Sequence, residues 1–221
     1  MTRHRLCLVH PVDPRLDPVG TVETRLRAIV ASRPSDFELV VVGRDGRGDL
    51  PLGEPVSFEV AGRHAVFVPV SRGLRTAFAT GLLRHVAVVR ELARAEVASI
   101  SVHGFAWTAL ARLVGRPIVL VAHHDPHAEG VAGRVPLALA LREWAALRIA
   151  DRIVGCDPGF VRYCRDRHPA IACKTELLPL AAADDAVSPF FRDDVQIARL
   201  WERHRRLFDA HAVHRGHHVA A

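Results

Sequence analysis

The feature that most constrains the fold is an alternation of strand-like and helix-like segments that runs from residue 5 to residue 180. The strand-like runs are short and rich in Val, Ile and Leu, as the buried strands of a parallel sheet are. The helix-like segments repeat apolar residues at intervals of three and four positions. This alternation is typical of α/β proteins. We therefore expect a Rossmann-like, doubly wound, mainly parallel sheet with helices on both faces.

The boundaries of these segments follow from apolar periodicity and from the Gly and Pro residues between them. A turn that contains Gly62 is expected to join two strands into a hairpin. We expect strands at residues 5–10, 37–43, 56–60, 64–70, 97–102, 118–122, 152–155 and 175–179. We expect helices at residues 21–32, 76–96, 106–114, 135–150 and 158–168.

The character of the chain changes after residue 180, where the expected α/β domain (residues 1–180) ends. Residues 181–192 are small and polar and are expected to be a linker. Residues 193–210 place apolar side chains on one stripe, which predicts an amphipathic helix. Residues 211–221 are rich in His and are expected to be a frayed tail. We expect the helix to cover an open side of the sheet rather than to anchor the chain to a membrane, because stable anchoring usually needs a second signal.

Composition narrows the class of partner. The formal net charge is +6, and Lys174 is the only lysine. A basic surface favours anionic partners, but aromatic residues are only 6% of the chain and no basic block carries them, so we expect no nucleic-acid binding. The four cysteines form no Cys-x-x-Cys pair, which favours a reducing, cytoplasmic setting. We expect no transmembrane segment, because no apolar stretch reaches about 20 residues.

The turn at residues 18–23 is the first candidate site. Gly20 lies between the first strand and its helix, where a glycine lets the backbone approach a ligand and the free N–H groups of the helix can hold a phosphate. The Gly-x-Gly-x-x-Gly fingerprint is absent, so a dinucleotide site is not expected. The alternative is an ordinary strand-to-helix turn, and the pattern alone favours it.

A cluster of polar residues is the second candidate. His123, His124 and Asp125 directly follow the expected strand 118–122, at the edge of the sheet where α/β proteins bind ligands. One interpretation is a polar site in which a histidine donates hydrogen bonds or carries a proton. The second interpretation is a metal site, to which His103 from the neighbouring strand would add a further ligand. A solvated loop is the third, because the chain has 14 histidines.

Two carboxylates are structural candidates. Glu143 and Asp151 are eight positions apart, and carboxylate pairs can serve as acid and base. Glu143 falls on an expected helix and Asp151 just beyond its end. We therefore favour local pairing with arginines for both.

Several motifs in order resemble the N-terminal domain of the GT-B-fold glycosyltransferases of family 4, which are retaining enzymes. The turn at 19–23 is similar to the family's Gly-Gly-x-Glu turn, and 117–123 to its Pro-led strand that ends in His. A helix with Glu143 then leads to 150–156, similar to Ala-Asp-x-Ile-Val-x-x-Ser. Residues 175–190 resemble the interdomain hinge. The resemblance covers roughly residues 5–191.

The chain departs from the family pattern at defined places. Val19 replaces the first glycine of the turn, Cys156 replaces the serine, and Ala181 and Ala182 replace the Asn-Gly of the hinge. The second domain, which binds the nucleotide sugar in the family, has no counterpart in the remaining residues. The resemblance therefore implies one half of a GT-B fold with a C-terminal helix.

The resemblance implies a hexosyltransferase whose co-substrate is a nucleotide-diphosphate sugar, with neither cofactor nor metal. His123 would be the catalytic residue, facing the donor sugar where charge develops, and the Gly20 N–H would lie near the donor diphosphate. The substrate-binding candidates are Gly20, Thr21, Glu23, His103, His124 and Asp125.

Three functions stay open. The first is the acceptor-side half of a transferase, acting on a sugar or lipid-linked acceptor with a separate donor-domain protein or a second copy of itself. Its setting would be the cytoplasm, with peripheral contact at the inner face of the membrane as an extension. The second is a truncated remnant or binding module without turnover. The third is a metal-dependent hydrolase that uses the His cluster.

Overall fold

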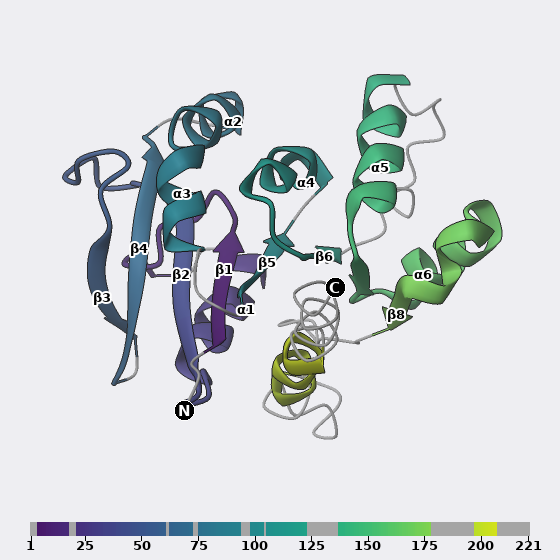
Figure 1. The fold of residues 1–221 in the computed structure, drawn as a ribbon, viewed down its shortest axis with the longest axis horizontal. Helices are drawn as coiled ribbons and strands as arrows, with labels where there is room; N and C mark the ends of the chain where they lie inside the picture. The colour runs from purple at the N-terminus through teal and green to yellow at the C-terminus, as the bar shows by residue number, and fades with distance from the viewer. Residues whose placement is uncertain are drawn as a thin grey trace, which may run out of the picture.

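The protein is seen here in a computed structural model whose centre is one eight-stranded sheet (Figure 1). The structure describes residues 4–17, 21–60, 62–72, 75–93, 98–103, 105–122, 137–177 and 197–206. The strands are β1 (His4–Val9), β2 (Phe37–Arg44), β3 (Val56–Val60), β4 (Arg63–Ser71), β5 (Ala98–His103), β6 (Ile118–Ala122), β7 (Arg152–Gly155) and β8 (Thr175–Leu177).

The strand order in the sheet is β3-β4-β2-β1-β5-β6-β7-β8. Every neighbouring pair is parallel except the β3–β4 hairpin, which is antiparallel and closes one edge. The expected mainly parallel, doubly wound α/β sheet is thus confirmed. The order reverses between β1 and β5, which makes this pair the switch point of the sheet.

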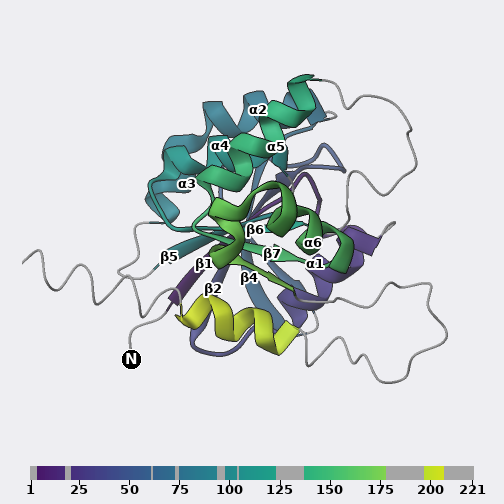
Figure 2. The ribbon, with the colours of Figure 1, turned by 90° about the vertical axis from the view of Figure 1, so that its right-hand side faces the viewer.

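Helices cover the two faces unequally (Figure 2). The helical elements are α1 (Thr21–Ala31), α2 (Arg75–Arg84), α3 (Val86–Leu92), α4 (Phe105–Ala111), η1 (Arg112–Val114), α5 (Leu137–Ile149), α6 (Pro158–Arg167) and η2 (Pro169–Lys174). Buried side chains of α2 through α6 form one core on one face. Side chains of α1 and of a helix at residues 197–206 form the second core on the other face.

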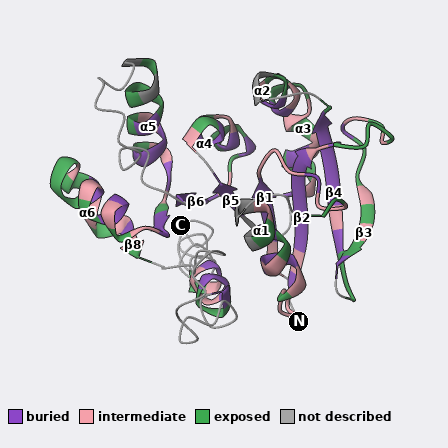
Figure 3. Ribbon diagram, turned by 180° about the vertical axis from the view of Figure 1, so that it is seen from behind, coloured by how far each residue is buried: buried purple, intermediate pink, exposed green. Residues whose placement is uncertain are grey.

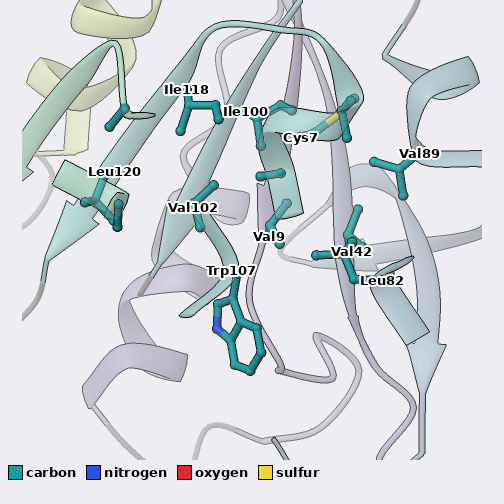
Figure 4. Close-up of a cluster of buried hydrophobic side chains, with 14 of the residues drawn as sticks. Cys7, Val9, Val42, Leu82, Val89, Ile100, Val102, Trp107, Ile118 and Leu120 are labelled. Atoms are coloured by element: carbon teal, nitrogen blue, oxygen red, sulfur yellow. The ribbon is translucent and has the colours of Figure 1, made fainter. Parts of the chain in front are cut away.

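The central strands β1, β2 and β6 are buried on both faces, as their apolar runs predict. In β1, Cys7 and Val9 point into the first core while Leu6 and Leu8 point into the second. Figure 4 shows Cys7 and Val9 among the apolar side chains of the first core. Burial raises the pKa of the Cys7 thiol to about 12, so this cysteine is a small apolar core residue.

One helix prediction is wrong. The pattern at 76–96 predicts one long helix, but the structure has α2 and α3 with a break at His85, where φ is −105° and ψ is 14°. The His85 ring lies against Gly53 in the loop between β2 and β3, and a Cβ on that glycine would come within 2.2 Å of the ring. This contact joins segments distant in the sequence, so apolar periodicity does not reveal it.

The helix at residues 197–206 packs against the sheet, as its apolar stripe predicts. The Trp201 ring lies 4.9 Å from the ring of Phe37, and Trp201 is 2% exposed. Arg205 pairs with Asp36 at 2.9 Å. The proposed linker at 181–192 and the tail at 211–221 lie outside the described residues, so the division into domains stays a prediction. Among the described helices, none is both long and apolar enough to cross a membrane.

His204 on this helix makes the stability of the fold sensitive to pH. The side chain is fully buried, and burial lowers its pKa to about 3. The folded state therefore resists protonation below pH 6.5, while the unfolded chain accepts the proton. The stability that neutral His204 contributes is fully present above pH 6.5, and it is lost as the pH falls toward 3.

When the pH is lowered from 7.5 to 5.5, we expect His204 to decrease the free energy of unfolding by about 1.4 kcal/mol. His204→Leu should abolish that part of the pH dependence, as measured by urea unfolding at both pH values. A variant with the same pH dependence as the natural chain would show that other groups cause it.

Candidate functional site

The candidate site begins at the switch point of the sheet, between β1 and β5. The connection that follows β1 leads to α1 on one face, and the connection that follows β5 leads to α4 on the other. The loops therefore diverge beyond the carboxyl ends of these two strands, which is where open α/β sheets have their ligand-binding crevice.

Two histidines lie together at this edge. His10 directly follows β1 and His103 is the last residue of β5, and their ring centroids are 6.3 Å apart in an edge-to-face arrangement. His103 is 2% exposed, and its Nε2 lies 3.3 Å from the Ser101 hydroxyl. Imidazole nitrogens can donate and accept hydrogen bonds, so this pair offers polar contacts at the edge of the sheet.

The sequence interpretation missed His10. It selected His103 and His123 because they end the expected strands, and His10 stands in the same relation to β1. With the strand order known, these three histidines terminate three adjacent strands, β1, β5 and β6. The signal was present, but only the order of strands in the sheet shows that the first strand belongs beside the other two.

The loop after β1 is held by an arginine that binds several carboxylates. Arg15 donates from Nη2 to Asp13 at 2.7 Å and to Asp45 at 2.7 Å. Its Nη1 donates to Asp49 at 2.8 Å. The side chains of Asp13 and Asp45 are fully buried. This network joins the β1–α1 loop to the β2–β3 loop and positions both beside the crevice.

The same network keeps its carboxylates ionised. Burial opposes the ionisation of Asp45, but hydrogen bonds from two backbone N–H groups and from Arg15 outweigh it and lower its pKa to about 2. Burial also opposes ionisation of Asp13, and its hydrogen bonds with Arg15 again give a lowered pKa. Both carboxylates are therefore charged and neutralised by the arginine across the physiological range.

Gly43 allows this loop to approach β2. A Cβ at this position would lie 2.1 Å from the Val12 carbonyl oxygen, which is too close for any other residue. The next residue, Arg44, donates its backbone N–H to the same oxygen at 3.0 Å. The close contact brings the loop over the end of β2 and places the Arg44 side chain beside it.

A cavity of about 300 Å³ lies beneath this loop, between α1 and the sheet. Leu8 of β1 and Val41 of β2 line it from the sheet, and His10 and Arg44 line it at the carboxyl ends of the same strands. Four residues on one face of α1 complete the wall: Glu23, Leu26, Arg27 and Val30. His10 therefore lines the cavity and also lies beside His103 at the switch point.

The residues expected from the sequence are only partly placed. Gly20, His123, His124 and Asp125 lie outside the described residues, so the catalytic assignment stays a prediction. Thr21 begins α1, and Glu23 lies in its first turn and lines the cavity. His103 lies beside His10. Of the six substrate-binding candidates, the structure thus places Glu23 in the wall of the cavity that His10 lines and His103 beside His10.

Glu143 and Asp151 make local contacts. Asp151 accepts the Ile118 N–H at 2.8 Å and pairs with Arg112 at 3.2 Å, which holds the start of β6. Glu143 is buried on α5 beside Tyr163. Burial first, and then the charge of Glu143 and its hydrogen bond, raise the pKa of Tyr163 to about 12.

Within the described ranges, no three His, Cys, Asp or Glu side chains are grouped so that they could hold a metal ion. The histidines on which the metal-dependent hydrolase depends, His123 and His124, are outside those ranges. The metal-dependent hydrolase therefore stays a prediction, with no metal-binding group among the described residues to support it.

Comparison with known proteins gives a likeness in fold. No protein-family profile and no curated protein sequence matches the chain. UDP-N-acetylglucosamine 2-epimerase from Rickettsia bellii aligns over 80% of this chain with a TM-score of 0.52 and 14% identity. A structure described as trehalose-6-phosphate from E. coli bound with UDP-2-fluoro glucose aligns over 79% of this chain and 48% of its own, with a TM-score of 0.43 and 11% identity.

The likeness to the epimerase shows the class of fold: a Rossmann-like α/β unit of the kind found in GT-B proteins. This chain spans 44% of the epimerase chain, which is less than half of its length. At such low identity the likeness extends to the fold alone.

Proposed function

We propose that these residues form the acceptor-side half of a retaining glycosyltransferase. A donor-binding half outside these 221 residues would bind the nucleotide-diphosphate sugar. The observation that carries the proposal is the pair His10 and His103 in the crevice at the switch point, within a fold of the GT-B kind. The order of the family-4-like motifs supports the same assignment.

In this proposal the crevice receives the acceptor and the transferred sugar. The acceptor oxygen bonds to the anomeric carbon as the bond to the diphosphate breaks, and the acceptor proton leaves with the diphosphate. His123 assists where charge develops at the reacting centre. His10 and His103 position the acceptor by hydrogen bonds at the neighbouring strand ends. A sugar or a lipid-linked sugar fits this role, and the basic surface fits an anionic donor or a membrane surface.

The first test is a calorimetric titration of the purified chain with UDP-glucose, UDP-N-acetylglucosamine and GDP-mannose. We expect no binding tighter than about 1 mM, because the proposal assigns the donor site to the other half. Binding in the micromolar range would overturn the division into two halves.

The second test uses the chain together with its donor-binding half, obtained by co-purification from the source organism or from a longer gene product. We expect the pair to transfer radiolabelled sugar, and we expect His123→Ala to lower the rate about 100-fold or more. His64→Ala is the matched control, because His64 is on β4 with its side chain 80% exposed. Equal rates for His123→Ala and the control would remove the catalytic role. Failure of every pair to transfer sugar would favour the remnant or binding module.

A further inference from the structure

The cavity beneath α1 has an apolar floor and a polar end. Glu23, Leu26, Arg27 and Val30 recur on α1 at the spacing of one helix face, so the cavity follows two turns of that helix, about 10 Å. Leu8 and Val41, paired in register, form its floor, and Val60 of β3 is in its wall. The polar end lies at the carboxyl ends of β1 and β2. The cavity is thus an elongated, mostly apolar slot whose polar groups gather near one end.

The polar end holds Arg44, for which the described residues supply no counter-ion. The Arg44 Nε is buried and has no hydrogen-bond partner, and no carboxylate in the described part of the chain pairs with the Arg44 guanidinium. A buried guanidinium nitrogen without an acceptor is unfavourable. An anionic ligand in the slot would supply a counter-ion for the guanidinium, because a guanidinium matches carboxylate and phosphate groups with two parallel hydrogen bonds.

Most of the other charged side chains around the slot form ion pairs with residues other than Arg44. Asp13 is held by Arg15 through both of its carboxylate oxygens. Arg27 pairs with Asp17 at 3.1 Å. Neither pair leaves a carboxylate for Arg44. Glu23 is the remaining carboxylate in the wall. Its negative charge would repel an anion in the slot and weaken the binding of that anion.

We propose that this slot binds a small amphipathic anion, with a carboxylate or phosphate head on Arg44 and an unbranched apolar tail along α1. A slot of this length accepts a tail of about eight carbons. Its volume lies at the lower end of the range for ligand pockets. The inference does not rest on sugar transfer, since it uses only the slot and its charges. An acyl carboxylate and an alkyl phosphate are the two sources of this chemistry.

The test is a calorimetric titration of the full chain with four probes: octanoate, octyl phosphate, 1-octanol and acetate. We expect octanoate or octyl phosphate to bind with a dissociation constant on the order of 100 µM, and the tighter of the two identifies the head group. We expect 1-octanol to bind at least about tenfold more weakly, because it has no charge for Arg44. Acetate should not bind measurably, because it has no tail. No binding of either anion at millimolar concentration would overturn the proposal.

Variants separate the charge from the apolar slot. Arg44→Gln should weaken the binding of the anion at least about tenfold. The affinity for 1-octanol should change by no more than about twofold. Arg63→Gln is the matched control, because Arg63 is exposed at the start of β4 and does not line the slot. Glu23→Gln should tighten the binding of the anion, because it removes a like charge. Unchanged affinity in Arg44→Gln, or weaker affinity in Glu23→Gln, would contradict the role of the charge.

A second variant keeps the proposal testable if Arg44→Gln does not fold. Val60→Phe adds volume to the slot from the edge strand, far in sequence from Arg44. We expect this variant to weaken the binding of octanoate and of 1-octanol to a similar extent. Circular dichroism checks that the variant folds. If Val60→Phe folds and binds octanoate as tightly as the natural chain, the ligand lies elsewhere and the proposal is wrong.

Discussion

Replacing Arg15 with leucine is expected to lower the free energy of unfolding by about 3–5 kcal/mol, the largest loss that we expect from a single charged residue. The side chain of Arg15 is 14% exposed, while those of Asp13 and Asp45 are fully buried. Removing the arginine leaves two buried carboxylates without their counter-ion. The loss comes from these uncompensated charges, so it exceeds what an exposed ion pair contributes.

Urea unfolding at pH 7 measures this loss, and Arg27→Leu is the matched control. Arg27 also pairs with an aspartate near the same loop, but that aspartate is fully exposed, so the control should lose at most about 1 kcal/mol. The gap between the natural chain and Arg15→Leu should narrow as the pH falls from about 4 toward 2. The folded-state pKa values of Asp13 and Asp45 are lowered, so the stability that they contribute is present above pH 4 and lost in acid. A gap independent of pH would contradict the electrostatic origin.

Trp201→Ala is expected to lower the free energy of unfolding by about 3–5 kcal/mol. Its ring is buried against Phe37, and its Nε1 donates to the Ser32 hydroxyl at 3.4 Å. The substitution would leave a cavity in the second core and loosen the helix at residues 197–206 from the sheet. In Figure 3 this helix carries buried as well as intermediate and exposed residues.

Trp144→Ala is the matched control for this prediction. Trp144 is 46% exposed on α5, where Arg148 lies over its ring at 4.7 Å. Its replacement should change stability by at most about 1 kcal/mol. Unfolding followed by circular dichroism avoids a signal that depends on tryptophan. Similar small losses in both variants would show that the C-terminal helix adds little to the fold.

The candidate site was harder to predict than the fold. The sequence identified His103 from its place at the end of a strand and Glu23 from the turn that resembles Gly-Gly-x-Glu. The structure places Glu23 in the cavity wall and His103 beside His10. The sequence did not identify His10, because the sequence alone does not show that the first strand lies beside the strand that ends in His103. It also gave no sign of the Arg15 network, whose partners are up to 34 residues apart.

The sequence by itself determined the elements and the class of fold. Apolar runs rich in Val and Ile can be satisfied only by strands buried on both faces, and the helical stripes between them supply the cover. The tertiary structure decided what depends on contacts between distant residues: the strand order, the break at His85, and the carboxylates that Arg15 neutralises. It also decided that the Arg44 guanidinium would lie at the end of an apolar slot with no carboxylate partner among the described residues. Local periodicity reports which face of an element is buried, whereas the neighbours of a buried charge are set only when the elements pack together.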